Sequence, residues 1–257
     1  MSKLFLVGAG PGDPDLITLK SIKAIQNADV ILYDALVCTE LLGYAKKNCK
    51  IVFAGKRYGC HYLSQKEIND LIIECSEKYE NVVRLKGGDP FIFGRAQEEM
   101  DVARNVGMEV EVIPGISSCI AAPASQMIPL TCRGINESFW VTTGTTSRGT
   151  ISEDIYLAAK SSATIIILMA MSKLEEIADI FIKEGKAETP VAIIENATTP
   201  DEKFVLGKIK DISFKAQYAN IQNPAVIIVG EVVNLHPHLI NKQIGQQLIS
   251  ATTNIRG

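Results

Sequence analysis

The chain of 257 residues lacks the long apolar runs and the excess of one charge that identify several large classes of protein. Its longest apolar candidate, Ala163–Ala170, has the length of a buried strand and is too short to cross a membrane. The formal net charge is only −3, with acidic and basic residues interspersed. We therefore expect no membrane insertion and no nucleic-acid binding through a broad basic surface, although these totals do not exclude a local basic pocket.

A metal-binding pattern is missing as well. The six cysteines include no C-x-x-C pair, and the three histidines do not complete a zinc pattern. We expect no metal, and we interpret the cysteines as reduced, structural thiols of a cytoplasmic protein. The first residues, MSKLFLVGAGPGD, show no signal-peptide architecture, because their apolar stretch is short and runs directly into a glycine-rich motif.

The first half of the chain alternates short β-branched segments with helix-like segments. The predicted strands are Leu4–Val7, Val30–Tyr33, Lys50–Ala54, Asn81–Leu85 and Met108–Ile113. The helix-like segments are Ile17–Gln26, Glu40–Lys46, Gln65–Tyr79 and Gln97–Asn105. Ser64-Gln65-Lys66-Glu67 reads as a capping box at the start of the third helix. This alternation predicts a mainly parallel sheet with helices on both faces.

The second half has a different pattern. The segment ISSCIAAPASQMIP is small, apolar and interrupted by proline, which is typical of a connecting helix and linker. Strands are predicted again at Ser138–Thr143, Ala163–Met169, Pro190–Glu195, Lys203–Lys210 and Ala225–Val233. The last three follow closely on one another, which indicates hairpins and a mixed sheet. We predict an α/β fold with two α/β domains, residues 1–115 and 116–235, and a C-terminal tail, residues 236–257.

Glycines, charges and hydroxyls follow every predicted strand of the first half. The segments after the five strands are GAGPGDPD, Asp34, Gly55-Lys56-Arg57, Lys86-Gly87-Gly88-Asp89-Pro90 and Pro114–Ser118. Ligands of open α/β sheets bind beyond the carboxyl ends of the strands. The sequence therefore predicts a binding site at this edge of the first sheet.

Neither common phosphate-binding motif fits these loops. In GAGPGDPD, Gly12 comes one residue too early for a dinucleotide fingerprint and Asp13 stands where the last glycine belongs. Pro11 lacks an N–H donor, and only Asp34 would fit, as a ribose-binding acid. Gly55-Lys56-Arg57 is not a P-loop, because no serine or threonine follows the lysine and the earlier glycine is absent. We reject both phosphate motifs.

The stretch KGGDPFIFGR is the most unusual of these loops. Gly87-Gly88 lets a ligand approach the backbone closely, and Asp89 before Pro90 favours an extended conformation. The three residues Phe91-Ile92-Phe93 add apolar surface. The stretch is either a tight turn above a hydrophobic plug or a pocket for a flat, polar-edged ligand such as an adenosine.

These loops and their surroundings closely resemble the tetrapyrrole (corrin/porphyrin) methylases. The similar segments are, in order, GAGPGDPDLITLK, VILYDALV, AGKRYG, SQKEIN, VVRLKGGDPFIFGRAQEE, VIPGISS, IPLTCRG, IIILMA, PVAIIENATTP and PAVIIVGEVV. The resemblance covers about residues 3–235. Within the family, KGGDPFIFGR is similar to the branch that methylates uroporphyrinogen III.

The resemblance implies a cleft between the two domains, a homodimer and S-adenosylmethionine as methyl donor, bound without a Rossmann fold. The implied reaction methylates uroporphyrinogen III at two ring carbons, C-2 and C-7, and gives precorrin-2 via precorrin-1 for sirohaem or cobalamin synthesis. The substrate is then a small polyanionic tetrapyrrole. Two alternatives stay open, a sister methylase that acts on a later precorrin and an inactive nucleotide-binding regulatory module.

Site residues follow from the matching motifs. The resemblance assigns cofactor contacts to Pro11, Gly87, Gly88, Asp89, Ile92, Ser117, Ser118, Met169 and Ala197. It gives Asp34 the role of base and Lys56 the role of acid. The substrate is ringed by carboxylates, which basic side chains can receive through charge-assisted hydrogen bonds. The further candidates for this role are Arg57, Lys86, Arg95 and Arg133.

Several of these residues have a plainer interpretation. Asp34 could be a helix N-cap or a surface acid at the end of a strand. Arg57 and Arg133 could form surface ion pairs, and Met169 could belong to the core.

The chain departs from the family pattern at two positions. Ala197 stands where relatives often have glycine. The departure therefore tests whether the backbone contact implied at this position tolerates a methyl group. Cys132 stands where relatives often have histidine, so no role is carried over to it.

Overall fold

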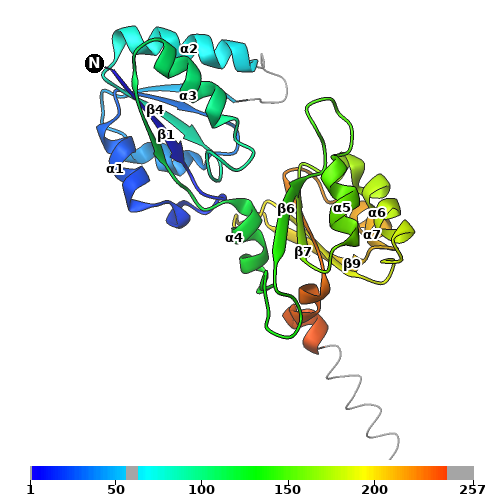
Figure 1. Cartoon of the computed structure of the whole chain (residues 1–257). Helices are drawn as coiled ribbons and strands as arrows, with labels where there is room; N and C mark the ends of the chain where they lie inside the picture. The colour runs from blue at the N-terminus through cyan, green and yellow to red at the C-terminus, as the bar shows by residue number, and fades with distance from the viewer. Residues whose placement is uncertain (1, 56–62, 242–257) are drawn as a thin grey trace, which may run out of the picture. The chain divides into compact units, whose positions relative to one another are not determined.

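The computed structural model describes residues 2–55 and 63–241. The chain divides into two compact units, residues 1–118 and 119–257, and each has its own sheet (Figure 1). Within the described ranges, no helix is long and apolar enough to cross a membrane.

The first unit is built on five parallel strands in the order β3-β2-β4-β1-β5. The strands are β1 (Lys3–Gly8), β2 (Val30–Tyr33), β3 (Lys50–Phe53), β4 (Asn81–Lys86) and β5 (Glu109–Ile113). Each lies within one residue of its predicted bounds, and the predicted parallel sheet is confirmed. Because all five strands run in the same direction, their carboxyl ends meet at one edge.

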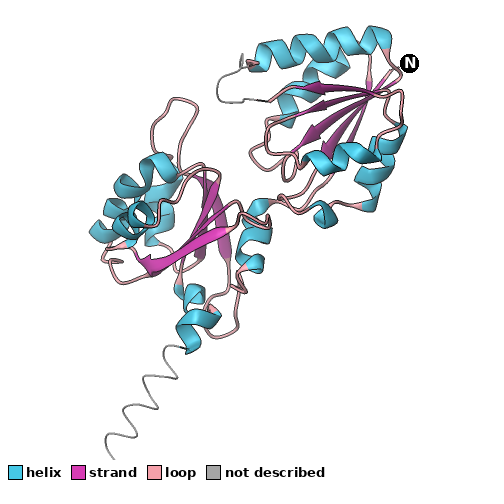
Figure 2. Cartoon of the chain, turned by 180° about the vertical axis from the view of Figure 1, so that it is seen from behind, coloured by secondary structure: helices cyan, strands magenta, loops and turns pink. Residues whose placement is uncertain are grey.

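Helices cover both faces of this sheet, as predicted (Figure 2). One face carries α1 (Leu19–Asn27) and the 3₁₀ helix Thr39–Tyr44, and the other carries α2 (Gln65–Lys78) and α3 (Ala96–Asn105). The capping box of α2 is confirmed, since Ser64 Oγ accepts the Glu67 N–H and the Glu67 carboxylate accepts the Ser64 N–H. The segment predicted as helix Glu40–Lys46 forms only the 3₁₀ helix, which contains a glycine and has no side-chain cap.

The second unit has a mixed sheet in the order β6-β7-β10-β8-β9. Its strands are β6 (Phe139–Thr143), β7 (Thr164–Leu168), β8 (Pro190–Glu195), β9 (Lys203–Lys208) and β10 (Ala225–Val229). Only β6 and β7 are parallel, whereas β10 is antiparallel to both of its neighbours and β8 forms an antiparallel hairpin with β9. The predicted mixed sheet is confirmed.

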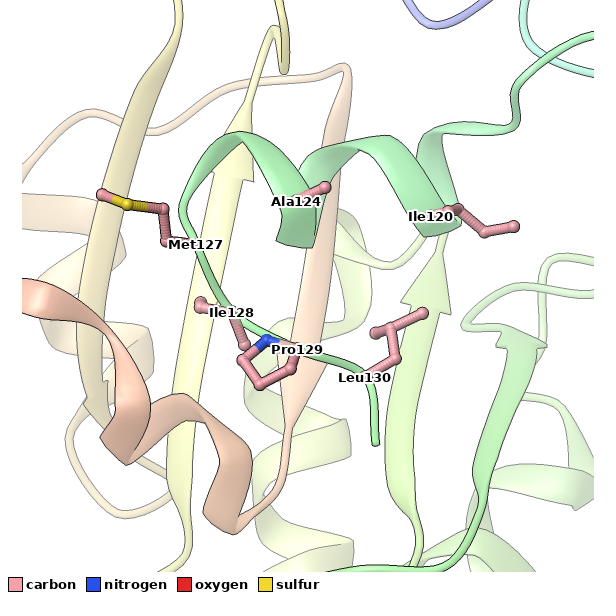
Figure 3. Close-up of a pocket in the computed structure, with 6 residues that line it drawn as sticks. All are labelled: Ile120, Ala124, Met127, Ile128, Pro129 and Leu130. Carbon is pink, nitrogen blue, oxygen red and sulfur yellow. The ribbon is translucent and has the colours of Figure 1, made fainter. Parts of the chain in front are cut away.

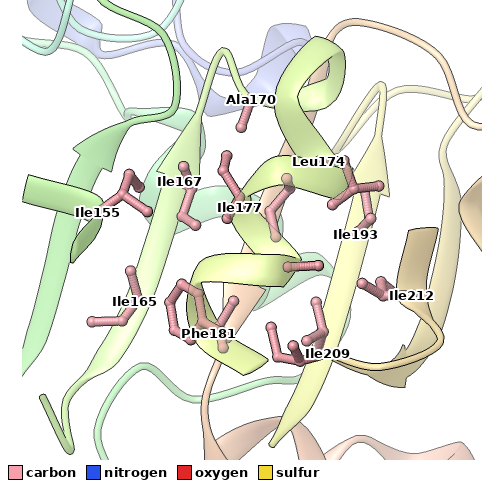
Figure 4. Packing of buried hydrophobic residues seen from close by; sticks show 14 of the residues in the cluster. Ile155, Ile165, Ile167, Ala170, Leu174, Ile177, Phe181, Ile193, Ile209 and Ile212 are labelled. Atoms are coloured by element: carbon pink, nitrogen blue, oxygen red, sulfur yellow. The ribbon is translucent and has the colours of Figure 1, made fainter. Parts of the chain in front are cut away.

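Two apolar clusters form the core of this unit. The helices α5 (Glu153–Lys160), α6 (Leu174–Lys183) and α7 (Ile212–Tyr218) contribute to the first cluster. Phe181 and Ile177 of α6 lie there among isoleucines of β7 and β8 (Figure 4). The second cluster contains residues of α4 (Ser118–Ser125) and of the 3₁₀ helix Glu231–Leu235.

The last strand is shorter than predicted. β10 ends at Val229, because Gly230 adopts a φ of +151° and the next five residues form the 3₁₀ helix. His236, the first residue of the predicted tail, is only 3% exposed and lies with Nε2 3.1 Å from Gln126 Oε1. The start of that segment is therefore packed against the second unit.

Three glycines bring the loops at the carboxyl edge of the first sheet into direct backbone contact. Gly8 ends β1, Gly88 follows β4 and Gly115 follows β5. A Cβ on Gly8 would overlap the Gly115 amide nitrogen and lie 2.8 Å from the Gly88 carbonyl oxygen. We call this contact the glycine crossing. No residue with a side chain fits at Gly8 or Gly115 without moving the backbone, and Gly88 has a positive φ of 67°.

We predict that Gly115→Ala destabilises the protein by about 1–3 kcal/mol, because the new methyl group would meet backbone that cannot rotate away. Gly43→Ala is the matched control, since a Cβ there meets nothing within 4 Å. Urea unfolding followed by circular dichroism measures both variants. Equal stability of the two variants would contradict the account of the crossing.

Candidate active site

The loop after β4 is held to its neighbours by backbone pairing and by Asp89. Gly10 and Gly88 exchange two hydrogen bonds, of 3.2 and 2.7 Å. The Asp89 carboxylate accepts the N–H of Phe91 at 2.8 Å with one oxygen and the N–H of Gly115 at 3.1 Å with the other. Asp89 therefore links the loops after β4 and β5, a structural role that the sequence did not reveal.

The apolar part of KGGDPFIFGR faces outward. Phe91, Ile92 and Phe93 are 55%, 42% and 45% exposed, so they do not form a plug beneath the turn, and that interpretation is wrong. Phe93 and Arg95 also adopt positive φ values of 54° and 55°, which are unfavourable for residues with side chains. Such conformations persist where the surrounding structure imposes them, often at functional sites.

Asp34 lies at the end of β2, between the sheet and the loop after β4. Its Oδ1 accepts the N–H of Gly87 at 3.2 Å, and its Oδ2 lies 3.3 Å from Nη2 of Arg84. The side chain keeps 25% of its surface exposed. It is not the N-cap of the following 3₁₀ helix, because that position belongs to Cys38. Asp34 thus has a fixed orientation and an accessible carboxylate.

Two cations and one further carboxylate are buried behind Asp34. Alternation along β4 places Arg84 and Lys86 on the same face of the sheet, and α3 turns Glu99 towards that face. Arg84 donates through Nε to Glu99 at 3.0 Å, and Lys86 Nζ lies 3.0 and 3.1 Å from the two Glu99 oxygens. Arg84 and Glu99 are 2% and 0% exposed. We call Asp34, Arg84, Lys86 and Glu99 the buried charge network.

Lys86 does not lie where a substrate-binding residue is expected. It is 5% exposed, and its ammonium group is occupied by the Glu99 carboxylate. Burial lowers the pKa of Lys86 and the Arg84 charge lowers it further, whereas Glu99 and Asp34 act in the opposite direction. This environment speaks against the predicted contact between Lys86 and a substrate carboxylate.

Arg95 is exposed, and its side chain is held by Glu98 in the first turn of α3. Its guanidinium donates to both oxygens of Glu98, at 2.7 and 2.8 Å. This hydrogen bonding lowers the pKa of Glu98. Arg95 therefore stays a candidate for the substrate carboxylates, with a partner that already orients it.

Several predicted cofactor residues of the first unit lie at or next to the glycine crossing. Gly88 has a φ of +67°, and a Cβ on it would lie 3.8 Å from Ser117 Cα. Ser117 is buried and Ser118 begins α4. Pro11 directly follows Gly10, whose backbone pairs with Gly88. The structure thus brings residues of three separate loops to one place.

Met169 and Ala197 belong to the second unit and follow two of its strands. Met169 is 51% exposed with a φ of +53°, so the interpretation as a core residue is wrong. Ala197 is buried in an apolar cluster, and its neighbours Asn196 and Thr198 have positive φ values of 48° and 68°. The methyl group of Ala197 therefore packs in this apolar cluster. The positive φ values belong to the residues before and after it.

The loop with Cys132 and Arg133 is organised by Asn136. The Asn136 amide accepts the Cys132 N–H at 2.9 Å and donates to the carbonyl oxygens of Leu130 and Ser138. Cys132 packs partly against an apolar cluster, and Arg133 is exposed. Arg133 is therefore accessible.

The predicted acid Lys56 and the predicted substrate residue Arg57 lie outside the described residues. The residue before them, Gly55, is buried, and a Cβ on it would lie 2.9 Å from the carbonyl carbon of Asp34. The loop after β3 therefore starts directly beside Asp34.

Arg84 and Glu99 are the residues that sequence reasoning missed. Both belong to the segment VVRLKGGDPFIFGRAQEE, but their roles depend on how α3 packs on β4. A signal was present, since Arg84 interrupts the apolar run of residues 82–85 and an acid lies on the apolar stripe of α3 with Ala96, Met100 and Ala103.

An apolar groove in the second unit has a different character. Its volume is about 620 Å³, and it is lined by Ile120, Ala124, Met127, Ile128, Pro129 and Leu130 (Figure 3). All six side chains are apolar, so the groove offers nothing to receive the charges of a polyanion. Among the described residues, no group of three histidine, cysteine or acidic side chains could hold a metal ion.

The carboxyl edge of the first sheet therefore combines the features of a site for acid–base chemistry on a small molecule. Asp34 supplies an accessible carboxylate, and Gly88, where a Cβ would meet no atom closer than 3.8 Å, supplies backbone that a ligand can approach closely. Such an edge is the usual location of ligands in open α/β sheets.

Known proteins have similar sequences and structures. The uroporphyrinogen-III C-methyltransferase of Methanocaldococcus jannaschii is 46% identical over 235 residues, which cover 91% of this chain and 97% of that protein. A uroporphyrin-III C-methyltransferase of Thermus thermophilus, solved in complex with S-adenyl homocysteine, is 34% identical with a TM-score of 0.79 and covers 91% of this chain and 94% of its own.

A third similar protein is a cobalt precorrin-4 methyltransferase, a cobalamin biosynthetic enzyme. It is 31% identical, has a TM-score of 0.80 and covers 90% of this chain and 95% of its own. The model of the tetrapyrrole (corrin/porphyrin) methylases matches residues 3–213. The chain belongs to the tetrapyrrole (corrin/porphyrin) methylase family.

Proposed function

We propose that this protein transfers methyl groups from S-adenosylmethionine to C-2 and C-7 of uroporphyrinogen III, giving precorrin-2 through precorrin-1. The product would enter sirohaem or cobalamin synthesis. The observation that carries this proposal is the 46% identity to a uroporphyrinogen-III C-methyltransferase over nearly the full length of both chains.

The residues at the glycine crossing suit the proposed cofactor. Gly87 and Gly88 present backbone without side chains, and Ile92, on the same loop, has an exposed apolar side chain. Ser117 and Pro11 come from the two neighbouring loops, and Met169 and Ala197 would contribute from the second unit. When bound, S-adenosylmethionine supplies a methyl group already activated by its sulfonium.

The remaining task of the chain is to position the substrate and to accept a proton. Arg95 and Arg133 are exposed cations that can hold substrate carboxylates, and Lys56 and Arg57 are proposed for the same region. Holding both reactants in line supplies much of the acceleration of such a transfer. A proton leaves the macrocycle after methylation, and the accessible carboxylate of Asp34 is proposed to take it. Lys56 is proposed as the acid.

The assembly and location of the protein are part of the same proposal. We expect a homodimer in the cytoplasm that binds neither nucleic acid nor membranes. The exposed apolar groove of the second unit is a surface that a second copy could cover.

A sister methylase acting on a later precorrin is the second candidate. The similarity to the cobalt precorrin-4 methyltransferase supports it. The TM-scores of this chain to that enzyme and to the Thermus thermophilus enzyme are 0.80 and 0.79, so the fold does not distinguish the two activities. The reaction itself has to distinguish them.

We predict that anaerobic incubation with uroporphyrinogen III and methyl-labelled S-adenosylmethionine gives a dimethylated product, detected by mass spectrometry. A protein that leaves uroporphyrinogen III unmethylated but labels a later precorrin would be the sister methylase. A protein that binds S-adenosylhomocysteine and methylates neither would be a regulatory module.

We predict that Asp34→Asn lowers turnover about 10²- to 10⁴-fold, the usual contribution of a positioned general base. The amide keeps an oxygen for the Gly87 N–H, and Asp34 is not among the proposed cofactor contacts, so binding of S-adenosylhomocysteine, measured by calorimetry, should stay unchanged. Asp15→Asn, an exposed acid of the first loop, is the matched control. Normal turnover of Asp34→Asn would remove Asp34 from the role of base.

A further inference from the structure

The buried charge network joins Asp34 to a residue that never reaches the surface. Glu99 on α3 is 0% exposed and contacts both buried cations, Arg84 at 3.0 Å and Lys86 at 3.0 and 3.1 Å. Arg84 in turn lies 3.3 Å from Asp34. Glu99 is therefore one residue removed from the proposed base.

Arg84 cannot easily leave this arrangement. Its Nη1 donates to the carbonyl oxygens of Leu32 and Leu85, at 3.3 and 3.1 Å, while Nε and Nη2 contact the two carboxylates. The guanidinium is thus held by four partners and presents one fixed edge to Asp34. Removal of one partner from a buried ion pair leaves an uncompensated charge, so each member depends on the others.

The charges of the network cancel when Asp34 is ionised. Arg84 and Lys86 from β4 are positive, and Glu99 from α3 and Asp34 from the end of β2 are negative. Without Glu99, two buried cations would face Asp34 alone and would make it a poor proton acceptor. Lys56 and Arg57 follow the neighbouring strand β3 and lie outside the described residues.

We propose that Glu99 is a positioning residue for the reaction, which holds Arg84 in place and offsets the buried cations so that Asp34 keeps its orientation and its basicity. The inference rests on the proposed function only for the role given to Asp34.

The network makes two single substitutions act in opposite directions. Glu99→Gln keeps the shape but removes a negative charge, so the Asp34 titration should move to lower pH. Arg84→Gln removes the cation in contact with Asp34, so the Asp34 titration should move to higher pH. If Glu99 and Arg84 served only the stability of the fold, the two substitutions would not shift the Asp34 titration in opposite directions.

A charge-balanced double variant is the control. Lys86→Met combined with Glu99→Gln removes one charge of each sign and leaves Arg84 beside Asp34. The pKa of Asp34 should therefore return close to its value in the unmodified protein.

The experiment titrates the Asp34 carboxyl by NMR in protein labelled with ¹³C at the aspartate side chains. The Asp34 signal is identified by its absence from Asp34→Asn, and circular dichroism shows which variants are folded. This readout needs no turnover, so failure of the proposed function and failure of this inference are distinguished. Should Glu99→Gln not fold, Lys86→Met alone tests the same network, with a rise in the pKa of Asp34 as the expected result.

Turnover provides the second readout in the same proteins. The acidic limb of the kcat profile should follow the pKa of Asp34 in each variant, and kcat of Glu99→Gln should fall about 3- to 10-fold near neutral pH. Binding of S-adenosylhomocysteine should not change. An unshifted Asp34 titration in folded Glu99→Gln, or shifts of both single variants in the same direction, would overturn the proposal.

Discussion

The close approach of three backbones at Gly8, Gly88 and Gly115 is the constraint on which the site of the first unit depends. It fixes how the loops after β1, β4 and β5 lie against one another, because a side chain at Gly8 or Gly115 would overlap the neighbouring carbonyl and amide groups and Gly88 has a positive φ. Asp89 can then bridge two of these loops, and the Gly87 N–H can meet Asp34. The loop KGGDPFIFGR thus allows its backbone to pack closely against two neighbouring loops. We propose that the surface formed in this way binds a ligand.

The buried charge network explains how a chain with a net charge of −3 contains cations deep in a sheet. Arg84 and Lys86 are neutralised within the fold by Glu99 and Asp34, and they are not available to attract a polyanion. Exposed cations such as Arg95 and Arg133 remain for that task. The basic residues of the family motif therefore divide into an internal group, which acts on Asp34, and an external group, which is proposed to act on the substrate.

Much of the fold could be predicted from the sequence because its signals are local. β-branched runs marked the strands, and Ser64 with Glu67 marked the start of α2. The burial of Lys86 could not be predicted in this way, since a lysine before Gly-Gly normally ends a strand in solvent. Its environment depends on Glu99, thirteen residues later, and on the face that α3 turns to the sheet. The exposure of Met169 likewise depends on a positive φ that no sequence pattern indicated.

A crystal structure of the protein with S-adenosylhomocysteine tests the central claim most directly, because that claim places the cofactor at the glycine crossing. The account predicts that the adenosyl group contacts the backbone of residues 87–89 and lies beside Ser117. The sulfur atom should point towards the exposed part of the Asp34 carboxylate. Binding of the nucleoside in the apolar groove of residues 120–130, or at the amino-terminal edge of the first sheet, would contradict it.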